Sequence, residues 1–258
     1  KERDTYEAPG GHREVGEDIL ETAKRELQEE TGAIQFDIKP ICVYSVTGKN
    51  SVNETGEETF GLLCFAEITE FSGKLESEME KVELMDELPQ NWTYPLIQPK
   101  LIEKYLQIER QYYSQIQLAA KQTIEYIKNI IKPGMNLLEI RKLCEGKLLE
   151  LGADSFWYWD VGAFVFAGDE TTVSVSGKQY VTSDRVIGNN DIITIDLSPQ
   201  VGNIWGDYAR TIIVENGMVV ENIGLIENPE WKSGLQMEEK LHAELLRFAT
   251  KETTFEKL

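Results

Sequence analysis

Residues 10–33 read GGHREVGEDILETAKRELQEETGA and combine a glycine-rich loop with a sharply delimited helix. Asp18 is placed to act as the helix N-cap, and Glu21, three residues later, completes a capping box. Gly32 stands where helices commonly end on a left-handed residue. The sequence therefore predicts a loop that runs directly into a helix between Asp18 and Gly32.

Three glutamates of this helix, Glu26, Glu29 and Glu30, lie at positions i, i+3 and i+4 and therefore share one helical face. Like charges at this spacing repel each other by about a few tenths of a kcal/mol per pair. A hard cation such as Mg²⁺ removes that cost, since it prefers carboxylate oxygens together with substrate phosphates. On spacing alone, the alternative is an acidic helix face that is simply solvated.

The spacing of the surrounding residues favours the metal interpretation. Gly11 is followed after five residues by Glu17 and, after seven more, by RELQEETG at 25–32. This resembles the Nudix box, G-x5-E-x7-R-E-U-x-E-E-x-G-U, at every fixed position except the last, where Ala33 replaces a bulkier apolar residue. The resemblance implies a Nudix α/β/α sandwich over residues 1–105. Because few residues precede the glycine turn, this sandwich is expected to be truncated at its N-terminus.

The resemblance to Nudix hydrolases also implies roles for individual residues. Five of them would form or support a site for Mg²⁺ or Mn²⁺: Glu17, Glu26, Glu29, Glu30 and the carbonyl of Gly10. Arg25 would orient the glutamates through charge-assisted hydrogen bonds, and Glu26, Glu29 and Arg25 would be catalytic. Gly10 and Gly11 would let the backbone approach the substrate phosphates. The implied reaction is attack of a metal-activated water on phosphorus.

Further features of the first hundred residues bear on the substrate. Many Nudix enzymes take another glutamate from a later loop, and LESEMEKVEL at 75–84 offers several, of which Glu78 is predicted to be catalytic. The strings VYSVTG, EETFGLLCFAEI and WTYPLIQPKLIEKY resemble the 8-oxo-dGTP diphosphatase branch, which implies release of 8-oxo-dGMP and pyrophosphate. Trp92 and Tyr94 are candidates to stack on a purine, with packing in the protein interior as the alternative.

The remainder of the chain has a different pattern. Two helices are expected from about residue 101, separated at Pro133-Gly134, and the second ends near Gly152. Strand-like strings follow between residues 155 and 225: FVFAG, TVSVSG, DIITIDLSP, YARTIIVENG and MVVENIG. A last helix is expected over 229–249. The sequence therefore predicts a second, α+β unit over residues 106–258.

Asp196 and Asp207 lie eleven residues apart within IDLSPQVGNIWGDYART. Both stand in strand-like sequence with a glycine-containing turn between them, so a hairpin would bring the two carboxylates together. Carboxylates that approach each other either raise one another's pKa or recruit a metal. Two unrelated aspartates at turns or edges are the alternative on spacing alone.

The string ID-x10-D-x-x-RT resembles the first two metal ligands of the pita-bread metallopeptidases, the methionine aminopeptidase, aminopeptidase P and creatinase family. IIKPGMNLLEIRKLCEGKLLELGAD also resembles the first helices of that family, and the likeness covers about residues 112–258. It implies the first half of a pita-bread fold, with a divalent-metal site at Asp196 and Asp207 only if further ligands are supplied. The family completes its site with a histidine and two glutamates, whereas His242 lies in amphipathic helical sequence and is interpreted as a helix-surface residue.

Composition limits the classes of partner. The 258 residues contain 26 Lys and Arg against 45 Asp and Glu, a net charge of −19. Such a chain repels a polyanionic backbone, so nucleic-acid polymers are not expected as partners, whereas a small nucleotide carried by metal cations is. The three scattered cysteines, Cys42, Cys64 and Cys144, suit a reducing compartment, and neither a membrane span nor a signal peptide is visible. The location expected from this is cytoplasmic.

Three hypotheses follow from these patterns. The leading one is a Mg²⁺-dependent Nudix pyrophosphohydrolase fused to a partial pita-bread half. The second is a metallopeptidase-like protein of the Xaa-Pro aminopeptidase or creatinase type, with an incomplete dinuclear site. The third is a non-catalytic fragment or binding module, since a sheet without its edge strands exposes apolar surface and unpaired strand edges. The nucleotide, the cleaved bond and the oligomeric state are not determined by the sequence.

Overall fold

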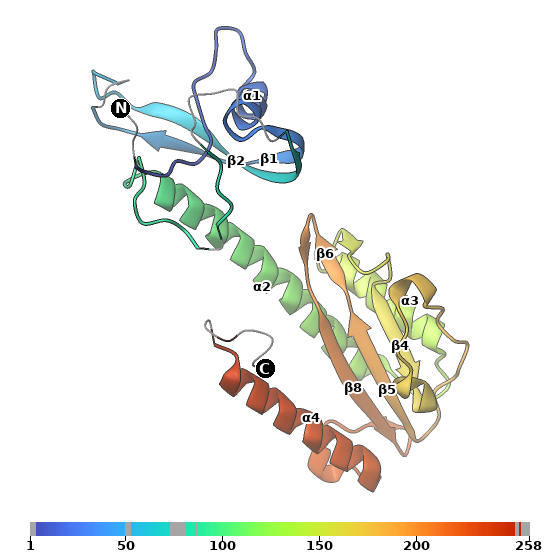
Figure 1. Cartoon of the computed structure of the whole chain (residues 1–258). Coiled ribbons are helices and arrows are strands. Elements are labelled where there is room, and N and C mark those ends of the chain that lie inside the picture. Colours follow the sequence, from blue (N-terminus) through green and yellow to red (C-terminus); the bar gives the residue numbers. More distant parts are fainter. Residues whose placement is uncertain (1–3, 50–52, 73–80, 86, 251–252, 254–258) are drawn as a thin grey trace. The chain divides into compact units, whose positions relative to one another are not determined.

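A computed structural model describes the chain, drawn in Figure 1, apart from residues 1–3, 50–52, 73–80, 86, 251–252 and 254–258. Its internal contacts divide it into two compact units, Lys1–Ile108 and Glu109–Leu258. The long helix α2 (Gln98–Ile130) spans the division. The mixed α/β and α+β class predicted from the sequence is confirmed, because each unit combines helices with small antiparallel sheets.

Helix α1 (Ile19–Thr31) of the first unit begins and ends where the sequence predicted, but the capping box is wrong, because the Glu21 carboxylate pairs with Lys24 instead of returning to Asp18. The Asp18 Oδ1 accepts a hydrogen bond from the Leu20 N–H at 2.9 Å and so caps the first turn. Gly32 adopts the left-handed conformation, with φ of 70°, and its N–H donates to the Gln28 carbonyl. These caps satisfy backbone groups that a helix end otherwise leaves unpaired, so local sequence alone fixes the length of α1.

Strands β1 (Ala33–Val46) and β2 (Thr59–Phe71) form an antiparallel pair beside α1 (Figure 1). Their register shifts just after Pro40, which has no N–H to give to a strand ladder. A parallel bridge between Tyr6 and Trp92 ties the segment before the glycine turn to the segment before α2. Of the Nudix sandwich expected from the sequence, the described residues show α1, this two-stranded sheet and the bridge.

The second unit contains two antiparallel sheets. The larger has the order β4-β5-β8-β9, with bounds Ala163–Ala167, Asp191–Leu197, Tyr208–Glu215 and Met218–Val219. The smaller has the order β3-β6-β7, with bounds Ser155–Phe156, Pro199–Val201 and Ile204–Trp205. The hairpin expected between Asp196 and Asp207 is confirmed, since β6 and β7 pair around a turn in which Gly202 has φ of 59°.

The core of this unit lies between the larger sheet and the helices α2 and α3 (Leu137–Glu150). Strand β5 alternates strictly, so that Ile193, Ile195 and Leu197 are fully buried while the residues between them are half-buried. From α2, Ile124 and Ile127 reach the same cluster. Buried β-branched and leucine side chains on both layers make this the best-packed part of the described chain.

One predicted strand is wrong. TVSVSG at 172–177 forms no strand, and short 3-10 helices flank it at Gly168–Thr172 and Gly177–Gln179. Val175 of this segment packs against the small aromatic cluster around Phe164 and Tyr180. Val173 of the same segment is 56% exposed, so the alternation of apolar and polar residues does not correspond to a buried strand face.

Helix α4 (Pro229–Phe248) follows β9 and the short 3-10 helix Ile223–Leu225. Its start is fixed by Asn228, which caps the first turn, and by Glu215, whose carboxylate accepts the backbone N–H groups of Glu227 and Asn228 at 2.8 Å. No residue of α4 is buried. Among the helices in the described part of the chain, none is both long and apolar enough to cross a membrane.

Candidate functional site

The loop before α1 folds back onto the helix face that carries the three glutamates. The Gly10 N–H donates to the Glu30 Oε2 at 2.9 Å. A Cβ atom placed on Gly11 would lie only 2.1 Å from the Glu26 carboxylate, so this position tolerates no side chain without displacing Glu26. The two glycines thus bring backbone within contact distance of two of the predicted ligands, whereas the predicted approach of this backbone to substrate phosphates stays a prediction.

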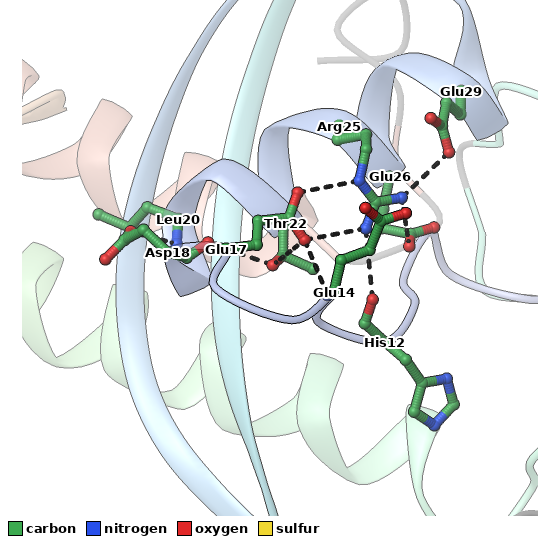
Figure 2. A network of polar contacts seen from close by, with 9 residues as sticks. All are labelled: His12, Glu14, Glu17, Asp18, Leu20, Thr22, Arg25, Glu26 and Glu29. Atoms are coloured by element: carbon green, nitrogen blue, oxygen red, sulfur yellow. Dashed lines mark hydrogen bonds and ion pairs between the residues drawn. The ribbon is translucent and has the colours of Figure 1, made fainter.

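Arg25 is the centre of the polar network in Figure 2. Its Nε donates to the Glu17 Oε1 at 2.9 Å, and its Nη2 donates to the Glu17 Oε2 at 3.2 Å and to the His12 carbonyl at 3.3 Å. Its Nη1 donates to the Glu26 Oε1 at 2.8 Å and to the Glu29 Oε2 at 3.2 Å. These carboxylates raise the pKa of Arg25, so the guanidinium stays charged.

The Glu17 carboxylate is saturated with donors. Besides Arg25, it accepts the Glu14 N–H at 3.1 Å and the Thr22 hydroxyl at 2.7 Å. Arg25, followed by the Glu14 N–H and Thr22, lowers the pKa of Glu17 to about 2. Glu17 is therefore ionised at any ordinary pH. Its hydrogen-bond donors are the Arg25 guanidinium, the Glu14 N–H and the Thr22 hydroxyl.

Glu30 lies in a different electrostatic environment. Partial burial of its carboxylate raises the pKa, and the Gly10 N–H opposes that rise. The charges of Glu26, Glu7 and Glu29 then add to it in that order. A carboxylate that is partly desolvated among other carboxylates is where an additional cation is most favoured.

The carboxylates of the three glutamates are suitable ligands for a divalent cation, although in the structure Glu26 and Glu29 bind Arg25 and Glu30 accepts the Gly10 N–H. Within the described residues, no three His, Cys, Asp or Glu side chains converge closely enough to hold an ion. The Arg25 Nη1 instead lies between Glu26 and Glu29 and is the positive charge that this pair binds in the structure. Carboxylate oxygens and the Gly10 backbone are a hard donor set, so the site suits Mg²⁺ or Mn²⁺ by its donor chemistry.

Other residues predicted for this unit are placed less centrally. Glu78, the predicted later glutamate, lies outside the described residues. Trp92 is half-buried at the bridge to Tyr6, and Tyr94 is 42% exposed just before α2. Nothing in these positions distinguishes stacking on a base from packing, so the roles of Trp92 and Tyr94 stay predictions.

The second predicted site lies at one end of the β5–β8 pair. Asp196 on β5 is opposite Ala209, and Asp207 immediately precedes β8. Burial, followed by the charge of Asp207 and a hydrogen bond with it, raises the pKa of Asp196 to about 6. The structure thus brings together the two carboxylates that the spacing predicted, whereas His242 lies exposed on α4 as the sequence indicated.

Thr22 is the site residue that sequence reasoning missed. It lies one turn before Glu26 and two before Glu29 on the same face of α1, at i, i+4 and i+7, and it is 4% exposed. The helical periodicity could have placed it there. Its bond to Glu17, however, depends on how the preceding loop folds back, which periodicity does not show.

Comparison with family models assigns the two parts separately. The NUDIX domain model matches residues 1–103, and the model of metallopeptidase family M24 matches residues 111–220. The two resemblances stated from the sequence, to Nudix hydrolases in the first part and to the pita-bread metallopeptidases in the second, are thus each confirmed by a model match. Both matched families are hydrolases that use divalent metals.

Several solved structures share part of the fold. The chain is similar to an X-Pro aminopeptidase from Thermotoga maritima MSB8, with 19% identity over 56% of this chain and 36% of that one and a TM-score of 0.46. It is similar to Xaa-Pro dipeptidase from Bacillus anthracis, with 24% identity over 45% and 32% of the two chains and a TM-score of 0.36. The dipeptidase PepE from Mycobacterium ulcerans is 16% identical over 40% and 26%, with a TM-score of 0.35.

The chain thus spans between 26% and 36% of the length of these three structures. No curated protein sequence matches the chain. Likenesses of this size describe an arrangement of elements and say nothing about substrate.

Proposed function

We propose that the N-terminal unit is a Mg²⁺-dependent pyrophosphohydrolase that acts on a nucleoside triphosphate or a similar nucleoside-diphosphate-linked compound. The observation that carries this proposal is the apposition of the Gly10-Gly11 backbone to Glu30 and Glu26 on the acidic face of α1. A backbone loop held against carboxylates by glycines is a suitable place for a metal-bridged phosphate chain. The match to the NUDIX domain model over residues 1–103 supports it.

In this proposal the chain's own residues do the positioning. Glu26, Glu29 and Glu30, with the Gly10 carbonyl, would hold the divalent cations, whose chemical contribution is to neutralise the diphosphate and activate water. Arg25 keeps Glu26 and Glu29 oriented, and Glu17 anchors Arg25. Glu78 is proposed to accept the proton of the attacking water.

For the substrate, we propose 8-oxo-dGTP as the first compound to test, with 8-oxo-dGMP and pyrophosphate as products. The support is the resemblance of three strings within residues 43–105 to that branch of the family and the aromatic pair Trp92 and Tyr94 before α2. The net charge of −19 is a further reason to favour a small, cation-bridged substrate over a polynucleotide.

The decisive experiment replaces one candidate ligand. Glu29→Gln keeps the size of the side chain and removes its charge, so Mg²⁺-dependent hydrolysis should fall by about 100-fold or more if Glu29 binds a cation. The assay covers 8-oxo-dGTP, the unmodified dNTPs, ADP-ribose and dinucleoside polyphosphates, with products identified by mass.

The matched control is Glu21→Gln, because Glu21 is an exposed glutamate of the same helix that pairs only with Lys24 at 2.7 Å. This variant should keep wild-type turnover. If Glu29→Gln remained active while folded, the assigned role of Glu29 would be wrong. If the folded wild-type protein turned over none of the compounds, a non-catalytic module would be favoured.

A second candidate function belongs to the M24 segment, namely metal-dependent peptide hydrolysis. The observation that favours it is the contact between Asp196 and Asp207, with the pKa of Asp196 raised to about 6 by burial and by its neighbour. Dipeptide hydrolysis with Mn²⁺ or Co²⁺ tests it. If such activity were present in the wild type and disappeared in Asp207→Asn, the peptidase reading would outrank the pyrophosphohydrolase.

A further inference from the structure

Thr22 makes a contact that is unusual for a buried threonine inside a helix. Such hydroxyls ordinarily bond only to the backbone carbonyl one turn earlier. The Thr22 hydroxyl does contact the Asp18 carbonyl at 3.1 Å, but its shorter contact, 2.7 Å, is to the Glu17 Oε2. A hydroxyl donating to an ionised carboxylate is a strong, directional hydrogen bond, especially where water is excluded.

We propose that Thr22 is a positioning residue of the N-terminal site, whose hydroxyl fixes Glu17 so that Glu17 can anchor Arg25 and Arg25 can hold Glu26 and Glu29 ready for the metal. This inference rests on the proposed function and adds to it Thr22, a residue outside the fixed positions of the Nudix box. The hydrogen bonds of the Thr22 hydroxyl go to Glu17 and to the Asp18 carbonyl, so Thr22 would act on Glu26 and Glu29 only through Glu17 and Arg25.

The Glu17 carboxylate can anchor Arg25 only if groups other than Arg25 also hold it in place. Two of its four donor groups, Nε and Nη2, belong to Arg25 itself. A carboxylate held only by the guanidinium that it is meant to anchor could move together with it. The other two donors, the Thr22 hydroxyl and the Glu14 N–H, connect Glu17 to the helix and to the loop. Thr22 is the one that belongs to the rigid helix.

When the Glu17 carboxylate is held in place, the Arg25 nitrogen that does not contact Glu17 is also oriented. The guanidinium is planar, so two nitrogens bound to one carboxylate determine where the third points. That third nitrogen, Nη1, reaches Glu26 at 2.8 Å and Glu29 at 3.2 Å. The chain of contacts therefore runs from the Thr22 hydroxyl to the two carboxylates without any step longer than a hydrogen bond.

The test uses the full-length chain with three substitutions. Thr22→Val keeps the shape and removes the hydroxyl, whereas Thr22→Ser keeps the hydroxyl. Thr31→Val is the matched control, because Thr31 is also buried on α1 and its hydroxyl contacts backbone, donating to the Leu27 carbonyl and accepting the Ala33 N–H at 3.2 Å. Should Thr22→Val not fold, Thr22→Ala takes its place, since it removes the same hydroxyl.

Two measurements score the variants. The first is hydrogen exchange of the Arg25 Nε–H, followed by NMR in metal-free protein. The second is Mn²⁺ binding, followed by the electron paramagnetic resonance of the free ion. Thr22→Val should accelerate the exchange and weaken Mn²⁺ binding by about 10-fold, the usual size of an effect exerted through a ligand's supporting hydrogen bonds. Thr22→Ser and Thr31→Val should match the wild type in both.

The outcomes separate this proposal from the proposed function. If Thr22→Val kept wild-type exchange at Arg25 and wild-type Mn²⁺ affinity, or if Thr31→Val lowered both equally, Thr22 would be only a packing residue. Wild-type protein that bound Mn²⁺ but hydrolysed no nucleotide would contradict the proposed function alone, because the Thr22 comparison would still be decided. Wild-type protein that bound no Mn²⁺ would overturn both.

Discussion

Arg25 supplies the positive charge of the N-terminal site as the structure presents it. It is 26% exposed and contacts Glu17, Glu26 and Glu29, so one guanidinium offsets much of the repulsion within this acidic face. Pairs of this exposure contribute little stability individually, but a planar cation shared by three carboxylates fixes their orientation. Arg25 therefore acts by orienting side chains, since its Nη1 holds the Glu26 and Glu29 carboxylates toward one another.

Asp196 gives a prediction about pH. Its native pKa of about 6 lies above its ordinary value of 3.8, so the folded state binds more protons than the unfolded state between those values. The contribution of Asp196 to stability should therefore be greatest below its ordinary pKa and fall as the pH rises through about 6. Asp196→Asn should abolish this fall and stabilise the protein at pH 7 by on the order of 1 kcal/mol, allowing for solvent screening.

Thermal unfolding of the wild type and of Asp196→Asn at pH 4 and pH 7 measures this effect. Asp184→Asn serves as the control, because it removes an exposed carboxylate of the same unit and leaves Asp196 in place, so it should keep the wild-type difference between the two pH values. Equal pH dependence in wild type and Asp196→Asn would show that burial of Asp196 costs the folded state nothing.

Among the elements, α2 and α4 differ sharply in what they bury. Ile124 of α2 is 1% exposed inside the main core cluster, whereas Leu241 of α4 is 61% exposed and no residue of α4 is buried. Helix α4 is instead held at its first turn by Asn228 and Glu215. Stability should therefore respond very differently to equivalent truncations in these two helices.

We predict that Ile124→Ala costs about 2 to 5 kcal/mol of unfolding free energy, because it opens a cavity in a packed core. Leu241→Ala should change it by less than about 0.5 kcal/mol, since the side chain is already largely solvated. Urea unfolding followed by tryptophan fluorescence compares the two variants. A large loss from Leu241→Ala would show that α4 is covered in solution.

At the scale of the whole molecule, the chain carries two candidate sites of different construction. The first depends on a loop and one helix, α1, whose positions are set by caps and glycines. The second depends on two paired strands, β5 and β8, and the hairpin between them. With 45 acidic against 26 basic residues, both sites lie in a strongly negative chain, so cations are needed before any phosphorylated substrate can approach.

The sequence by itself determined the features that depend on short spacing. It predicted both ends of α1, the shared face of Glu26, Glu29 and Glu30, and the hairpin that joins Asp196 to Asp207. Caps, helical periodicity and turn glycines act within about ten residues, so they can be read without knowing the fold. The strand predicted at 172–177 was wrong, because alternation of apolar and polar residues does not by itself provide a neighbouring strand to pair with.

Only the tertiary structure decided how the loop returns to the helix. The bonds from Gly10 to Glu30, from Arg25 to His12 and Glu17, and from Thr22 to Glu17 depend on the path of the loop chain. The type of a residue does not predict such a contact, since a threonine that becomes buried cannot be distinguished in sequence from one that stays on the surface. The folded path of the loop brings these groups together. It is stable because an ionised carboxylate that is partly removed from water costs free energy unless hydrogen-bond donors contact it.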